Sequence, residues 1–95
     1  MNEIISIDQP ITSMQIAEVT GKRHDHILRD IKDEIEKLEN AGVPTHPKFG
    51  VRARMGITGE IPYYELSKEG VLQLAARYDA VIRAKLIELA MRQGK

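Results

Sequence analysis

Residues 12–35 read Thr-Ser-Met-Gln-Ile-Ala-Glu-Val-Thr-Gly-Lys-Arg-His-Asp-His-Ile-Leu-Arg-Asp-Ile-Lys-Asp-Glu-Ile, and they predict two helices joined by a turn. Thr12 and Gln15 have the Thr-x-x-Gln spacing of a capping box, which marks the start of a first helix of about two turns. Gly21 suits the left-handed conformation that ends many helices. A basic, His-rich segment then opens a longer second helix. This order is typical of a helix-turn-helix, in which the second helix can enter the major groove of DNA.

The second helix is expected to run from about Arg23 to Asn40. Its apolar residues form one narrow stripe at the helical period, namely Ile27, Leu28, Ile31, Ile35 and Leu38. Gly42 and Pro44 then predict its end. Helix-turn-helix sequences usually have an apolar residue directly after the turn glycine, whereas Lys22 stands here. We therefore expect a longer turn, from Gly21 to His24.

A β-hairpin is predicted in the second half of the chain. Residues 49–55 alternate, with arginines on the exposed face (Arg52 and Arg54) and apolar side chains on the other (Phe49, Val51, Ala53 and Met55). Residues 56–59 read Gly-Ile-Thr-Gly, which is turn chemistry, and residues 61–66 supply the return strand. Such a hairpin corresponds to the wing of a winged helix.

Helix signals follow the hairpin. Ser67 is a good N-cap, and Glu69 lies in the first turn, where the helix dipole favours an acid. Asp79 is a second candidate cap, for a helix to about Arg92 with apolar positions Val81, Ile82, Leu86, Leu89 and Ala90. The pattern leaves open whether this region forms one helix or two. Near the N-terminus, the isoleucine-rich residues 3–7 predict a short strand. The predicted fold class is therefore α+β and winged-helix-like, with residues 1–95 forming a single domain.

Composition excludes several classes of protein. The chain has 95 residues and no cysteine, so disulfides, zinc fingers and cysteine nucleophiles are excluded. No apolar run approaches the ~20 residues of a membrane span, and the acidic N-terminus does not resemble a signal peptide. We therefore expect a cytoplasmic location with no membrane partner. One Phe, three Tyr and no Trp predict an aliphatic core.

The net charge is zero, which argues against a DNA-binding protein because such proteins usually neutralise phosphates. The charges are unevenly distributed, however. Residues 1–47 carry a net charge of −4 and residues 48–95 carry +4. Within the acidic half, residues 22–32 are locally basic. A molecule with this dipolar distribution can still present one basic face.

The run Ile-Ala-Glu-Val-Thr-Gly-Lys-Arg-His-Asp-His-Ile-Leu-Arg-Asp-Ile at residues 16–31 closely resembles the N-terminal domain of the phage regulatory Rha family. Residues 64–70, Tyr-Glu-Leu-Ser-Lys-Glu-Gly, and residues 83–85, Arg-Ala-Lys, are also similar to that family. The resemblance covers roughly residues 11–92. It implies a regulator encoded by a phage or prophage and acting in the bacterial host cell, with a winged-helix-like DNA-binding domain. Longer members carry a further C-terminal region.

Eight basic residues are the candidates for contacts to double-stranded DNA. Arg23 and its neighbours lie at the start of the second helix, where backbone N–H groups favour a phosphate, and Arg29 shares an exposed helix face with His26. The two hairpin arginines are candidates for contacts to a DNA backbone or minor groove, with Lys48 as a weaker addition. The candidate set is Lys22, Arg23, His24, His26, Arg29, Lys32, Arg52 and Arg54. The later, acidic part of the helix would repel phosphates, so only the first two turns are expected to approach DNA.

Other readings remain open at this point. An antirepressor-like module that binds another regulator protein is the alternative, because the net charge is zero and half of the chain is acidic. The apolar residues of the C-terminal helix exceed what one packed face needs, so we expect a homodimer through that helix. His24 and His26 would point about 200° apart on a helix, which excludes a shared metal ion. We expect no enzymatic activity, no metal and no cofactor, since no catalytic constellation is present.

Overall fold

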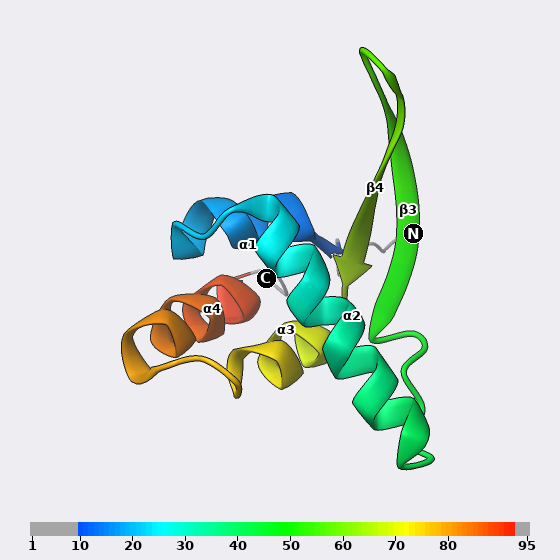
Figure 1. Cartoon of the computed structure of the whole chain (residues 1–95). Helices are drawn as coiled ribbons and strands as arrows, with labels where there is room; N and C mark the ends of the chain where they lie inside the picture. The colour runs from blue at the N-terminus through cyan, green and yellow to red at the C-terminus, as the bar shows by residue number, and fades with distance from the viewer. Residues whose placement is uncertain (1–9, 93–95) are drawn as a thin grey trace, which may run out of the picture.

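The computed structural model describes residues 10–92 of the chain, and the strand predicted at residues 3–7 lies outside them. The fold is mixed α+β, as predicted (Figure 1). Its elements in chain order are β2 (Ile11–Thr12), α1 (Ser13–Thr20), α2 (His24–Asn40), β3 (Phe49–Gly56), β4 (Gly59–Leu66), α3 (Lys68–Ala75) and α4 (Ala80–Arg92).

The first two helices form where the capping signals predict them. The Thr12 hydroxyl accepts a hydrogen bond from the Gln15 N–H (3.1 Å), and Gln15 Oε1 accepts one from the Thr12 N–H (2.9 Å), which completes the capping box. Gly21 ends α1 with φ of 75°, in the left-handed region that favours glycine. The helix α2 begins at His24, so the turn comprises residues 21–23 and is one residue shorter than predicted.

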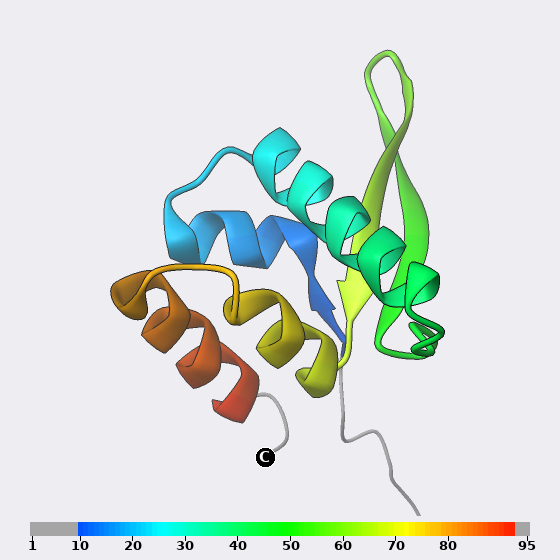
Figure 2. The ribbon, with the colours of Figure 1, turned by 60° about the horizontal axis from the view of Figure 1, so that its bottom comes forward.

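The three strands form an antiparallel sheet in the order β2-β4-β3. Leu66 of β4 pairs with Phe49 of β3 on one side and with Ile11 of β2 on the other. The β3–β4 hairpin was predicted, although β4 begins at Gly59, two residues earlier than expected. The strand β2 was not predicted, because two residues are too few to show an alternating pattern. Beyond its base, the hairpin projects away from the helices (Figures 1 and 2).

The C-terminal region forms two helices, which settles the question that the sequence left open. Ser67 Oγ accepts a hydrogen bond from the Gly70 N–H (3.2 Å) and caps α3. Asp79 Oδ1 accepts one from the Ile82 N–H (3.0 Å) and caps α4. Both caps were predicted from the sequence. The two helices lie side by side below α1 and α2 in the view of Figure 2.

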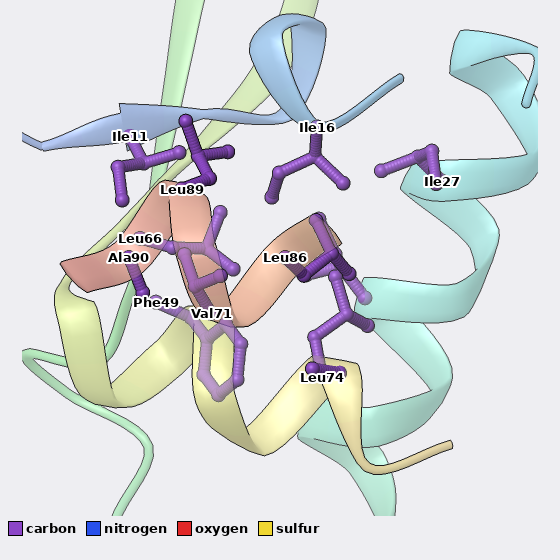
Figure 3. Close-up of a cluster of buried hydrophobic side chains, with 12 residues drawn as sticks. Ile11, Ile16, Ile27, Phe49, Leu66, Val71, Leu74, Leu86, Leu89 and Ala90 are labelled. Atoms are coloured by element: carbon purple, nitrogen blue, oxygen red, sulfur yellow. The ribbon is translucent and has the colours of Figure 1, made fainter. Parts of the chain in front are cut away.

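The core lies between the sheet base and the four helices (Figure 3). Every element contributes to it, and Phe49 is its one aromatic member among the described residues, so the predicted aliphatic core is confirmed. Its buried side chains are Ile11, Ile16, Ile27, Ile31, Phe49, Leu66, Val71, Leu74, Ala75, Leu86, Leu89 and Ala90.

The prediction that Val81 of α4 belongs to the core is wrong. Val81 is 66% exposed, whereas Leu86 and Ala90 are buried. At 100° per residue, Val81 points away from the side of the helix that carries Leu86 and Ala90. Only one side of α4 therefore packs on the fold. Within residues 10–92, no helix has the length and apolar composition needed to cross a bilayer.

Candidate nucleic-acid interface

The outward face of α2 carries three of the predicted contact residues. The helix buries Ile27 and Ile31 in the core, so side chains at intermediate positions point outward. His26, Arg29 and Lys32 are all exposed. The structure therefore brings these three basic residues to one accessible side of α2.

A groove separates this side of α2 from the β3–β4 hairpin. Its volume is about 350 Å³, and it is lined from the helix by Leu28, Arg29 and Lys32 and from the hairpin by Val51, Pro62, Tyr63 and Tyr64. Sequence reasoning identified the two basic residues but missed the apolar and aromatic wall. Leu28 was predicted as part of the apolar stripe; in the structure it is half-buried and lines this groove instead of joining the core cluster.

The hairpin has a buried face only at its base. Phe49 and Leu66 are buried there, but Val51 is 67% exposed and Met55 is 75% exposed. The expectation that the apolar side of the hairpin would be covered is therefore wrong beyond the first residue pair, because the hairpin extends past the helices. The tip projects on the side where α2 begins (Figure 2).

The two hairpin arginines differ in their surroundings. Arg52 Nε donates to Glu65 Oε1 across the strands (3.1 Å), so part of its charge is balanced within the hairpin. Arg54 is exposed, and its charge acts on His24 at the start of α2. Arg54 therefore lies within electrostatic reach of the start of α2.

Lys22 and Arg23, in the turn before α2, both have partners within the protein. Lys22 Nζ lies 5.3 Å from the centroid of the Tyr78 ring, in a cation–π contact. Arg23 Nη2 pairs with Asp25 Oδ2 at 2.8 Å, and both side chains are largely exposed. Arg23, the N-cap residue of α2, makes no side-chain capping hydrogen bond, whereas the His26 N–H donates to the backbone carbonyl of Arg23 (3.1 Å).

His24 belongs to the interior of the site. Its Nε2 lies 2.8 Å from Ser13 Oγ, and Ser13 Oγ also accepts a hydrogen bond from the Tyr64 N–H (3.1 Å). Burial lowers the pKa of His24 below its ordinary value, and the charge of Arg54 lowers it further against an opposing effect of Asp25. These contacts tie His24 to the fold, so we leave it out of the DNA contacts proposed below.

The acidic residues in the middle of α2 are largely paired with α3 and the segment that follows it. Arg77 Nη2 lies 3.1 Å from Asp33 Oδ2, and Arg77 Nη1 lies 3.0 Å from Glu34 Oε1. The Tyr78 hydroxyl donates to Asp30 Oδ2 (2.6 Å). The sequence carries no local signal for these pairs, because the partners are more than forty residues apart.

Residues 11–90 match the sequence profile of the family described as phage regulatory protein Rha. A comparison with curated proteins and one with solved structures found no significant match. The family match spans most of the chain and includes β2, all four helices except the last residues of α4, and the hairpin. The chain therefore belongs to the phage regulatory protein Rha family.

Proposed function

We propose that this phage regulatory protein is a non-catalytic transcriptional regulator that binds double-stranded DNA. In this proposal, α1 and α2 form a helix-turn-helix with α2 as the recognition helix. The β3–β4 hairpin follows α2 as the wing, and β2 joins it at its base. This order supports a winged-helix-like mode of binding, in which one helix enters the major groove and the hairpin contacts flanking DNA.

The groove between α2 and the hairpin is the observation that carries the proposal. Arg29 and Lys32 lie on its helix side, and Val51 and Pro62 lie on its hairpin side. A DNA strand complements both surfaces of the groove. Its phosphates are anionic, and its sugars are largely apolar. A phosphate would meet Lys32 while the sugars pack against the apolar wall, and Arg29 would be left to reach a base edge.

Each remaining candidate has a distinct expected role. Arg29 is suited to a bidentate contact with guanine, and Lys32 to a phosphate contact. His26 shares the exposed face with Arg29. Arg23 and Lys22 directly precede α2, where the positive end of the helix dipole favours a phosphate. Arg54 and Arg52 extend the contact along the hairpin. Part of the Arg52 charge is balanced by Glu65.

The test is binding of the protein to a pool of random duplex DNA, measured by fluorescence anisotropy over a range of salt concentrations. Phosphate contacts release counterions, so affinity should fall steeply as salt rises. Selection of the tightest binders should then enrich a sequence motif. No binding at low salt would overturn the proposal. It would favour instead a module that binds another regulator protein, for which a pull-down from host lysate is the next step.

We also propose that two copies associate through α4. Ile87 and Met91 are exposed on this helix although they are large and apolar. Two-fold symmetry of the protein would appear as a palindrome in the selected DNA motif. Analytical ultracentrifugation should show a dimer, and a double substitution of Ile87→Ser and Met91→Ser should shift it to a monomer. A wild-type monomer at tens of micromolar, a range chosen to exceed ordinary dimer affinities, would contradict this.

A further inference from the structure

A recognition helix that carries carboxylates poses an electrostatic problem. Asp33 and Glu34 follow directly after Lys32 in α2. Charges separated by less than the Debye length, about 10 Å at 0.1 M salt, act on one another and on a nearby phosphate. If these two carboxylates acted freely, they would offset the attraction that Arg29 and Lys32 exert on DNA.

One side chain from outside α2 contacts both of these carboxylates. Arg77 follows α3, and its guanidinium donates through Nη2 to Asp33 Oδ2 (3.1 Å) and through Nη1 to Glu34 Oε1 (3.0 Å). Arg77 Nη1 also donates to the backbone carbonyl of Asp30 (3.1 Å). The guanidinium is therefore held against α2 by three acceptors that lie within five residues of that helix.

Neighbouring side chains hold the same carboxylates in place. Gln73 Nε2 donates to Glu34 Oε2 (2.7 Å), and Lys37 Nζ lies 3.1 Å from Asp33 Oδ2. The side chain of Glu34 is only 15% exposed and that of Arg77 only 26%, so water screens their interaction less than it would on an open surface. Hydrogen bonds lower the pKa of Asp33, with a larger effect from Lys37 and a smaller one from Arg77. They keep its carboxylate ionised and paired.

We infer that Arg77 is a positioning residue for DNA binding: together with Lys37 it balances the two carboxylates of Asp33 and Glu34, so that α2 presents its basic face to DNA without their repulsion. Arg77 contributes its charge from outside α2 and is not itself a proposed DNA contact. The inference rests on the proposed function and extends it to a residue outside the groove. It also explains how a chain with zero net charge uses an acidic helix to bind DNA.

The decisive variant is the double substitution Asp33→Asn and Glu34→Gln. It removes all three ion pairs that these carboxylates make with Arg77 and Lys37, so the free energy of unfolding should fall. It also leaves the charges of Arg77 and Lys37 uncompensated on and beside α2, so the affinity for duplex DNA should rise about tenfold at low salt. Stability and affinity therefore change in opposite directions. A purely structural ion-pair network would lower the stability and would change the affinity no more than a control pair with the same change in net charge.

The reverse variant is Arg77→Gln, which should weaken DNA binding about tenfold at low salt while circular dichroism shows that the helices remain. Combining Arg77→Gln with the double substitution of Asp33 and Glu34 should restore the affinity to at least the wild-type value, because the triple variant carries one more net positive charge than the wild type. The matched control for the double variant is the pair Glu69→Gln on α3 and Glu88→Gln on α4. It changes the net charge by the same amount as the substitutions of Asp33 and Glu34. It should alter binding much less than the substitutions on α2.

Two results would overturn the inference. One is a double variant of Asp33 and Glu34 that binds DNA no more tightly than the control pair. The other is a folded Arg77→Gln protein with wild-type affinity. In either case the wild-type protein would still bind DNA, and the proposed function would stand. Absence of salt-dependent binding by the wild-type protein would instead overturn the proposed function, and this inference with it.

Discussion

The side chains of Ser13 and His24 lie 2.8 Å apart between Oγ and Nε2, and they join the first residues of α1 and α2. Ser13 is fully buried, and its hydroxyl also accepts a hydrogen bond from the Tyr64 N–H of β4. With that acceptor site occupied, the hydroxyl is free to donate its proton to the neutral imidazole. Two hydrogen bonds at the Ser13 hydroxyl thus fix both helices and the hairpin strand relative to one another.

Acidification should destabilise the protein through His24. Its pKa in the folded protein lies below the ordinary value of 6.5, so the unfolded chain binds the proton more readily. The stabilisation is therefore fully present above 6.5 and is lost as the pH falls below it toward the folded pKa. Urea unfolding at pH 7.5 and 5.5, values chosen to lie on either side of 6.5, should show a lower free energy of unfolding at the acidic pH.

The control for this titration is His24→Gln, which keeps a polar side chain but does not titrate in this range. The variant should be less stable than wild type at neutral pH and should depend less on pH. If it keeps the full pH dependence of the wild type, another group is responsible and the assignment to His24 fails.

Replacing Ser13 by Ala should destabilise the fold. The substitution removes the acceptor of the Tyr64 N–H and the partner of His24 in a buried position. A buried polar group left without a partner costs about 1–3 kcal/mol. Thermal or urea unfolding measures this loss. Thr58→Ala, in the exposed turn of the hairpin, is the control and should stay within about 0.5 kcal/mol of wild type.

Gly70→Ala should also destabilise the protein, against the usual trend. Alanine is a better helix former than glycine. If position 70 of α3 faced open space, the change would therefore stabilise the protein by up to about 1 kcal/mol. Here a Cβ at position 70 would overlap the carbonyl oxygen of Lys48, which also accepts the Ser67 N–H (3.0 Å). We expect a loss of about 1–3 kcal/mol from this overpacking. Urea unfolding that shows equal or greater stability would contradict the packing described at this contact.

On the proposed DNA-binding face, Arg29→Ala and Lys32→Ala should have different effects. Loss of a bidentate base contact from Arg29 should cost about 1–3 kcal/mol on the selected site and relax its sequence preference. Loss of a phosphate contact from Lys32 should weaken binding to all sequences and reduce the salt slope by about one. Anisotropy titrations on selected and random duplexes separate the two cases. Lys85→Ala, an exposed position on α4, is the control for charge; unchanged affinity for both α2 variants would remove this helix from the interface.

The sequence by itself determined the helices and the hairpin, because their signals act over a few residues. The Thr12–Gln15 capping box, the glycine after α1 and the caps of α3 and α4 all formed as predicted. Local hydrogen bonds and periodic burial require no knowledge of the rest of the chain. For the same reason, the sequence placed Arg29 and Lys32 on the exposed side of α2.

Only the tertiary structure decided how these elements make a site. It paired β2 with β4 and placed the hairpin across a groove from α2. It also turned His24 inward to Ser13 and brought Arg77 onto the carboxylates of α2. Except for the Ser13–His24 contact, these arrangements join residues far apart in the chain, and no local pattern encodes them. They arise because the shared aliphatic core fixes where each helix and strand lies, and the polar side chains at its edge then find the partners that this packing brings near.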